Sequence, residues 1–346
     1  MQYDELITLE NLFSAWEEFK RGKQGKQDVM EFERNLEDHI FALHGDLVNK
    51  TYTHGVYHTF HVYDPKFRVI NKATVRDRVV HHLLFRYLEP IFQPRFIYQS
   101  FSCQKRKGLH MAVEELSRAL RKSSRNYTQI VWALKLDIKK FFDSVDHEIL
   151  LGLFYKRMAD NEVRWLLERI VRGYSSSQGV GKGVPIGNLT SQIFANIYLS
   201  ELDYFVKFKL KERYYFRYAD DFVISHHDPA YLDGLIETIK AFLSERVALS
   251  LHPQKIIILK FSQGIDFLGY VLLPHYSVLR TKTKRRMFNK IGKRVAEYNN
   301  GERDNYSLNQ TMQSYLGMLT HCNGYKVEQK LRNEVWLRTT SPPRFL

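Results

Sequence analysis

The sequence predicts an α+β fold, because helical and strand-like segments follow one another without a regular βαβ alternation. Long segments carry apolar residues at helical spacing, whereas shorter ones show period-two alternation or many β-branched and aromatic residues. The chain has 346 residues, of which 44% are hydrophobic and 26% charged, and this composition is typical of a packed globular protein. A disordered protein is therefore excluded.

Helices are predicted where apolar residues recur every three or four positions, as in LITLENLFSAWEEFK. The helix that begins at residue 73 is expected to end near Pro90, because proline lacks a backbone N–H. Asn188 or Thr190 is expected to cap the helix after the Gly/Ser-rich loop 175–188. The predicted helices cover residues 5–50 (with a basic loop at 20–26), 73–92, 108–124, 146–172, 188–210 and 229–248, and a basic helix follows residue 278.

Strands are predicted where alternating or β-branched and aromatic residues meet turn signals. WALKL forms a strand that ends at Asp137, and residues 213–227 form a hairpin around Asp220 and Asp221. The predicted extended segments are 52–72, the start of 131–145, the two arms of 213–227, 255–261 and 265–273.

The charge of the chain predicts a polyanionic partner. There are 52 Lys and Arg residues against 38 Asp and Glu residues, which gives a net charge of +14 and favours nucleic acid. The two cysteines lie far apart, so a disulfide scaffold or a zinc site is not expected, and a reducing compartment fits. The start MQYDELITLE is not typical of a signal peptide, and the apolar runs are too short for a bilayer, so a cytoplasmic protein without membrane contact is predicted.

Asp220 and Asp221 are adjacent acids between two strand-like segments, and like charges this close require counter-charge. Two Mg²⁺ ions would supply it, because two-metal phosphoryl-transfer sites hold their ions on shared carboxylates. Asp137, at the end of a strand, is the expected third acid. Taken alone, the Asp-Asp pair is also ordinary turn chemistry.

The segments around these acids resemble reverse transcriptases, in collinear order over about residues 60–275. YADD at 218–221 resembles the catalytic motif, and LDIKKFFDSVDHEIL at 136–150 resembles the first palm motif, with Asp137 at its acidic position. The further matching segments are the fingers-like KFRVINKATVRDRVVHHLL at 66–84, the loop-plus-helix VPIGNLTSQIFANIYLSELD at 184–203, the lysine-motif-like LSLHPQKI at 249–256 and the primer-grip-like FLGY at 267–270.

This resemblance implies a right-hand polymerase that copies RNA into DNA with two Mg²⁺ ions. It implies that Asp137, Asp220 and Asp221 hold the metals, together with the backbone carbonyl of Ile138. The expected substrates and partners are dNTPs, template RNA and the RNA–cDNA hybrid. The implied parts are fingers with an N-terminal helical extension at 1–84 and 147–186, a palm at 85–146 and 187–277, and a thumb at 278–346.

Several residues then have two alternative roles. Phe142 is interpreted as the steric gate against a ribose 2′-OH, or as a core aromatic residue. Lys66 and Arg68 contact the incoming triphosphate, or only the RNA backbone. Lys255 is a general acid for the departing pyrophosphate, or a simple phosphate contact. The expected primer grip consists of Phe267, Leu268, Gly269 and Tyr270.

Pro185-Ile186-Gly187-Asn188, followed by Leu-Thr-Ser-Gln, resembles the reverse transcriptases of diversity-generating retroelements, whereas most bacterial members have Pro-Gln-Gly. SCQKRKG at 102–108 resembles their fingers loop. The resemblance implies copying of a template-repeat RNA into cDNA with errors at adenines, and an accessory variability-determinant protein as partner. Ile186 and Asn188 are then expected at the nucleotide site.

Two other functions remain open. An antiphage-defence or retron-type reverse transcriptase would keep the chemistry without diversification, and Ile186 argues against it. A non-catalytic RNA-binding scaffold would keep only the fold, and the intact acids argue against it. His81-His82 and His226-His227 are expected at the surface or on backbone contacts, because no third metal ligand has suitable spacing. The basic face after residue 280 is expected to grip a duplex by its shape and backbone.

Overall fold

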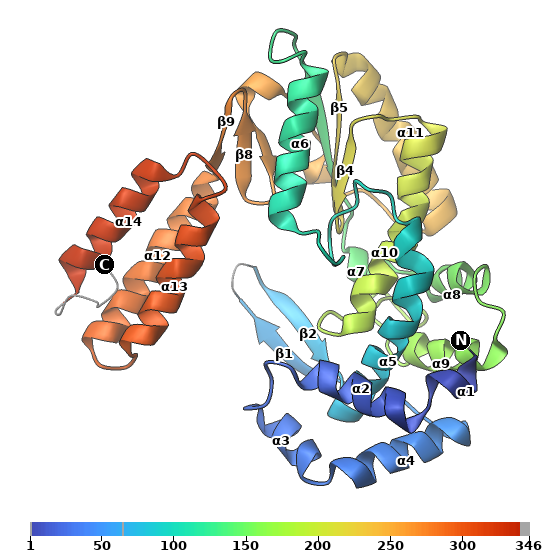
Figure 1. Cartoon of the computed structure of the whole chain (residues 1–346). Helices are drawn as coiled ribbons and strands as arrows, with labels where there is room; N and C mark the ends of the chain where they lie inside the picture. The colour runs from blue at the N-terminus through green and yellow to red at the C-terminus, as the bar shows by residue number, and fades with distance from the viewer. Residues whose placement is uncertain (1, 64–65, 340–346) are drawn as a thin grey trace. The chain divides into compact units, whose positions relative to one another are not determined.

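The computed structural model describes residues 2–63 and 66–339. Helices and antiparallel strands are mixed in it (Figure 1), so the α+β prediction is confirmed. The helices are α1 (Tyr3–Leu6), α2 (Leu9–Lys20), α3 (Gln27–Arg34), α4 (Leu36–Val48), α5 (Val75–Phe92), α6 (Leu109–Ser123), α7 (Phe141–Ser144), α8 (His147–Tyr155), α9 (Asn161–Arg172), α10 (Leu189–Tyr204), α11 (Pro229–Val247), α12 (Thr281–Asn299), α13 (Asn305–Leu319) and α14 (Tyr325–Arg338).

The strands form three sheets. β1 pairs with β2 as a hairpin, the second sheet has the order β4-β5-β3-β6, and the third has the order β7-β8-β9. The strands are β1 (His58–Val62), β2 (Arg68–Lys72), β3 (Trp132–Asp137), β4 (Tyr215–Tyr218), β5 (Asp221–His226), β6 (Ile257–Lys260), β7 (Ile265–Phe267), β8 (Tyr270–Leu273) and β9 (Tyr276–Leu279).

The chain divides into two compact units. The first comprises Met1–Lys107, Leu136–Phe222 and Leu235–Ile256, and the second comprises the remaining segments. The predicted acids, Ile138 and the predicted nucleotide-contacting residues all belong to the first unit, whereas Phe267–Tyr270 belongs to the second. The division into fingers, palm and thumb stays a prediction.

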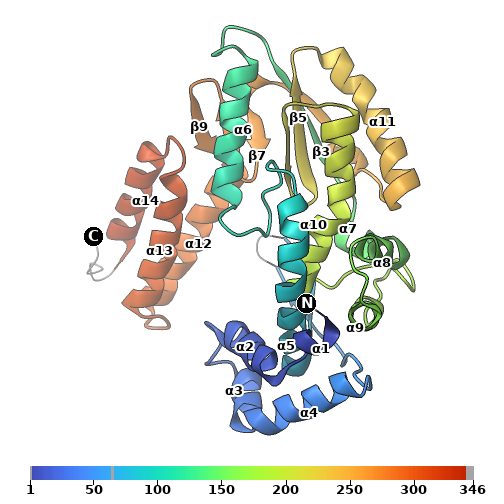
Figure 2. The same cartoon turned by 45° about the vertical axis from the view of Figure 1, so that its right-hand side comes forward.

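Helices α5 and α10 pack together in the first unit, and α2 lies along α5 (Figure 2). Most of α10 is buried, so its polar side chains find partners inside the protein. The Tyr198 hydroxyl, for example, donates to the Val247 carbonyl at 2.7 Å. Side-chain oxygens cap the neighbouring helices: Thr74 accepts from the backbone of Asp77, and Asp146 accepts from the start of α8.

In the second unit, α12, α13 and α14 form a helical bundle, and β7, β8 and β9 form an antiparallel sheet. The turn between β7 and β8 has Leu268 and Gly269 at φ +50° and +91°. Positive φ at both central residues is the geometry of tight hairpin turns. The Tyr270 hydroxyl donates to the Met318 carbonyl of α13 at 3.0 Å, so the FLGY segment is tied to the bundle.

The strands after residue 264 differ from the prediction. Residues 265–273 form two strands and not one, because the positive-φ pair at 268–269 reverses the chain. A further strand, β9, precedes the basic helix. Helix α5 ends at Phe92, the predicted end of this helix and two residues after Pro90.

Two polar residues also have other environments than predicted. His81 is buried, and its Nδ1 lies 2.6 Å from the Thr190 hydroxyl, so it is not a surface residue. Asn188 holds the N-cap position of α10, but its side chain makes no capping bond. Among the described residues, no helix is long and apolar enough to cross a membrane.

Candidate active site

Asp220 sits at the tip of the β4–β5 hairpin. The turn consists of Ala219 and Asp220, and Ala219 has φ +52°, a left-handed conformation that is uncommon for a residue with a side chain. The Asp220 carbonyl accepts a hydrogen bond from the Ile138 amide at 3.2 Å. The hairpin tip is therefore fastened to the residue that follows Asp137.

Asp137 is the last residue of β3, the strand beside β5, as predicted. Its side chain is buried, and its carbonyl accepts from the His252 amide at 2.8 Å. The Lys139 amide donates to the Ser250 carbonyl at 2.9 Å. Backbone hydrogen bonds therefore join the segment 137–139 both to the β4–β5 tip and to residues 250–252.

Two lysine side chains lie near the two acids. Lys255 Nζ lies 2.7 Å from Asp137 Oδ1, and the lysine is about 40% exposed. Burial of the Asp220 carboxyl raises its pKa, and the nearby charge of Asp137 raises it further. Lys255 and Lys66 act in the opposite direction on the pKa of Asp220. The two carboxylates therefore share one electrostatic environment, which favours a bound cation.

The oxygen donors of this site fit Mg²⁺. Asp137 and Asp220 offer two hard carboxylate ligands, and the Ile138 carbonyl accepts none of the hydrogen bonds that fix this segment. Asp221 begins β5 and is partly exposed. Among the described residues, no three His, Cys, Asp or Glu side chains gather into a metal-binding cluster. Protein-bound Mg²⁺ commonly uses one or two carboxylates together with substrate phosphates, so a cluster of three is not required.

A cavity of about 570 Å³ lies in the same unit. The strand β2, the segment after Asp137 and the two ends of the Gly/Ser-rich loop form its wall. Arg68 and Ile186, both predicted to contact the nucleotide, are among the lining residues. The others are Phe67, Val69, Asn71, Lys140, Asp143, Tyr174, Ser175, Ser177 and Val184.

The Ile186 segment is fixed to β2. The Asn71 amide donates to the Ile186 carbonyl at 3.0 Å, and Asn188 Nδ2 donates to the Asn71 carbonyl at 2.9 Å. Gly187 has φ +118°, and a Cβ there would lie 2.8 Å from the Ile70 side chain, so glycine is required. Asn188 is buried, and its Oδ1 accepts from the Ala73 amide at 3.1 Å. Its side chain joins two backbone segments, and its contact with a nucleotide stays a prediction.

Phe142 and Phe141 have different environments although they are neighbours. Phe141 is buried, whereas Phe142 is partly exposed and contacts Phe141 edge to face. The Phe142 carbonyl accepts from the Val184 amide at 2.8 Å. This bond places Phe142 next to a residue of the cavity wall. Lys140, with φ +47°, forms the turn that leads into this short helix.

The structure adds residues that the sequence did not single out. Asn71 Nδ2 donates to the Tyr174 hydroxyl at 3.1 Å, so two cavity residues from distant segments are linked. Asn71 lies in the predicted fingers segment, but nothing in its local sequence marks it. Arg76 lies 2.5 Å from the carboxylate of Asp46 and 3.9 Å from that of Asp77.

A sheet in which a strand-end acid meets an acid on a hairpin tip, together with antiparallel strands and a helical bundle, has the fold class of a right-hand polymerase. The family model described as reverse transcriptase (RNA-dependent DNA polymerase) matches residues 62–272, more than half of the chain. The chain therefore belongs to the reverse transcriptase family, and the family prediction is confirmed.

Curated relatives agree with this membership. Protein YkfC of Escherichia coli (strain K12) is 25% identical over 244 residues, covering 60% of this chain and 64% of YkfC. The group II intron-encoded protein LtrA of Lactococcus lactis subsp. cremoris is 25% identical over 293 residues, covering 65% of this chain and 48% of LtrA. The chain thus spans less than two thirds of the length of either relative.

A solved structure of telomerase from Candida albicans, with a fragment of telomeric RNA, aligns with a TM-score of 0.48 and 13% identity. The alignment covers 82% of this chain and 55% of the telomerase chain.

The raised pKa of Asp220 predicts how this acid affects stability. A carboxyl whose pKa is higher in the folded than in the unfolded protein lowers the free energy of unfolding when the pH is above the folded-state pKa. When the pH is below the unfolded-state pKa, the carboxyl is protonated in both states and has no such effect. Without divalent cations, Asp220→Asn should therefore raise the melting temperature at pH 7. The gain should shrink as the pH falls through the raised pKa of Asp220. Thermal unfolding across this pH range checks it, with exposed Asp233→Asn as control; a lower melting temperature at pH 7 would contradict it.

Proposed function

We propose that this protein is an RNA-directed DNA polymerase that extends a primer by nucleotidyl transfer at Asp137 and Asp220. The supporting observation is the close electrostatic coupling of these two acids, with lysines on either side in sequence. Family membership gives the reaction class. A structural ion pair alone would not place a second carboxylate beside the first, because their repulsion makes folding less favourable.

The reaction joins a primer 3′-oxygen to the α-phosphorus of a dNTP and breaks the bond to pyrophosphate. Asp137 and Asp220 would hold Mg²⁺, with the Ile138 carbonyl and Asp221 assisting. Bound Mg²⁺ supplies a lower pKa for the primer hydroxyl and charge stabilisation for the leaving oxygen. Lys66 and Arg68, both exposed at the β1–β2 hairpin, neutralise the triphosphate in this proposal. Lys255 then contacts phosphate or donates a proton to pyrophosphate.

We further propose that the enzyme copies a template RNA with reduced fidelity, as part of a diversity-generating retroelement. Ile186 lines the cavity and has no hydrogen-bonding side chain. Its backbone carbonyl accepts a hydrogen bond from the Asn71 amide of β2. An accessory variability-determinant protein as partner belongs to the same proposal. Phe267–Tyr270 would contact the primer strand.

Loss of either acid should abolish polymerisation. Asp137→Asn and Asp220→Asn keep the shape of the side chain but remove the charge that a metal requires, so primer extension on an RNA template with Mg²⁺ should fall by more than about 10²-fold. Exposed Asp233→Asn serves as the matched control and should keep full activity. Extension by both site variants within tenfold of the unmodified protein would remove these acids from the mechanism.

Phe142 should exclude ribonucleotides. Phe142→Ala removes the ring, so kcat/KM for rNTPs should rise relative to that for dNTPs by at least about tenfold, a difference of about 1.4 kcal/mol. Phe208→Ala, at a phenylalanine that is 62% exposed, provides the control. Unchanged discrimination would make Phe142 a packing residue only.

Ile186→Gln should raise fidelity, most clearly opposite template adenine. Glutamine restores a hydrogen-bonding group in a site where such a bond contributes about 0.5–1.5 kcal/mol, so correct and incorrect pairs would differ more. Sequencing of cDNA made from one defined RNA measures the error rate at each base. Ile257→Gln, at an exposed isoleucine of β6, is the control. Equal adenine error rates in the Ile186 variant and the unmodified protein would show that the errors arise elsewhere.

A further inference from the structure

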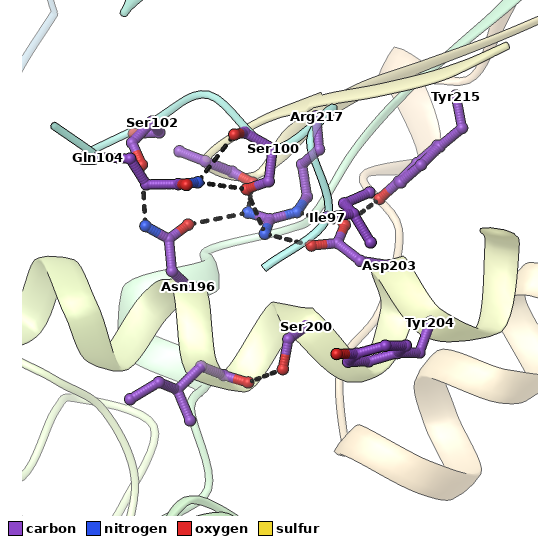
Figure 3. Close-up of polar contacts among 12 residues, drawn as sticks. Ile97, Ser100, Ser102, Gln104, Asn196, Ser200, Asp203, Tyr204, Tyr215 and Arg217 are labelled. Atoms are coloured by element: carbon purple, nitrogen blue, oxygen red, sulfur yellow. Dashed lines mark hydrogen bonds and ion pairs between the residues drawn. The ribbon is translucent and has the colours of Figure 1, made fainter. Parts of the chain in front are cut away.

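A charged cluster is completely buried behind the β4–β5 hairpin (Figure 3). Arg217 of β4 and Asp203 of α10 are both 0% exposed. Arg217 Nε lies 2.7 Å from Asp203 Oδ1, and its Nη2 lies 2.6 Å from Asp203 Oδ2, so the pair is bidentate. The Tyr215 hydroxyl also donates to Asp203, at 2.7 Å. The burial of such charges is costly unless they are paired and fully hydrogen-bonded.

The remaining donors of Arg217 reach two other segments. Its Nη1 donates to the Ala219 carbonyl at 3.1 Å, which belongs to the strained turn before Asp220. Its Nη2 donates to the Ser100 hydroxyl at 2.9 Å. The next carbonyl in the turn, that of Asp220, is held by Ile138, so consecutive carbonyls are fixed from two separate elements.

The loop 97–107, which includes most of SCQKRKG, is built onto the same hairpin. The Phe101 amide donates to the Arg217 carbonyl at 3.1 Å, and the Arg217 amide donates to the Gln99 carbonyl at 3.0 Å. Ser102 hydrogen-bonds the side chain of Tyr218, and its carbonyl accepts from Asn196 Nδ2 at 2.8 Å. The loop therefore contacts both residues that precede Ala219.

A lysine and a glutamine of this loop donate hydrogen bonds to backbone carbonyls of the same loop. Lys107 Nζ donates to the carbonyls of Tyr98 and Ser100, each at 2.9 Å, and Gln104 Nε2 donates to the Ser100 carbonyl at 2.8 Å. The Lys107 ammonium is thus bonded to backbone carbonyls within the loop itself. The loop is a stable support for Ser100 and Ser102.

We propose that Arg217 is a positioning residue, which holds the Ala219 turn so that Asp220 faces Asp137, with loop 97–107 as its support. This inference rests on the proposed function for its catalytic consequence. Only a guanidinium has enough donors in a planar fork to bind a carboxylate in bidentate fashion and still reach a carbonyl and a hydroxyl. One of these bonds goes to the turn that carries Asp220, so the pair is connected directly to the acid-bearing tip of the hairpin.

The test separates positioning from stability. Removal of Arg217 alone leaves Asp203 buried and unpaired, so Arg217→Met is expected to destabilise the fold. The double variant Arg217→Met with Asp203→Leu replaces both charges by apolar groups, which is often tolerated. Arg217→Lys retains the charge with fewer donors. Arg164→Met is the matched control, because Arg164 donates to the Met158 and Tyr155 carbonyls away from the acids.

Two quantities are measured for each variant, at a temperature where thermal unfolding shows that it is folded. One is Mn²⁺ binding by isothermal titration calorimetry, with Asp220→Asn to identify the site. The other is kcat and KM for dNTP in primer extension. The double variant should bind Mn²⁺ at least tenfold more weakly and lose at least tenfold in kcat, with KM changed less than threefold. Arg217→Lys should lie between it and the unmodified protein, and Arg164→Met should match the latter.

If the folded double variant has the Mn²⁺ affinity and the kcat of the unmodified protein, the proposal is overturned, because the pair would then have no role beyond its own burial. If Arg164→Met and Arg217→Met lower the Mn²⁺ affinity and the kcat of the folded protein equally, the proposal is also overturned. If the unmodified protein binds Mn²⁺ at Asp220 but does not extend a primer, the proposed polymerase function fails. The binding data alone then decide whether Arg217 positions the turn.

Discussion

Asp137 lies close enough to Asp220 to disfavour its ionisation, and the surrounding structure has to offset this repulsion. Lys255 contacts Asp137 directly, which supplies charge on one side. Backbone bonds from Ile138 and His252 hold the two aspartate-bearing segments in place. A chain without these contacts would relax by separating the acids. The geometry of the site is therefore maintained by a lysine ion pair and by backbone hydrogen bonds.

At the cavity, too, backbone hydrogen bonds hold the segments that carry the lining residues. Ile186 and Arg68 face it, but Asn71 and Asn188 fix the backbone that carries them. Asn188 is buried, and both ends of its amide bond backbone groups, whereas Ile186 lines the cavity.

Membership in the reverse transcriptase family places the chain among proteins that share a scaffold and differ in their tasks. The two curated relatives named above share about a quarter of the aligned residues with it. The buried Arg217–Asp203 pair belongs to the scaffold by its location, since it joins α10 to the hairpin. The properties specific to this chain are then expected at positions such as Ile186, which lines the cavity.

The sequence by itself determined the class of fold, the strand end at Asp137, the hairpin around Asp220 and most helices, because these depend on local periodicity and on short motifs. It did not reveal the turn at 268–269, the burial of His81 or the internal role of Lys107, because each depends on what packs against the residue. The bonds of Arg217 to Asp203 and Ser100 join positions 14 and 117 residues away. Only the tertiary structure brings these groups together, since no local pattern specifies which distant partner will satisfy a buried charge.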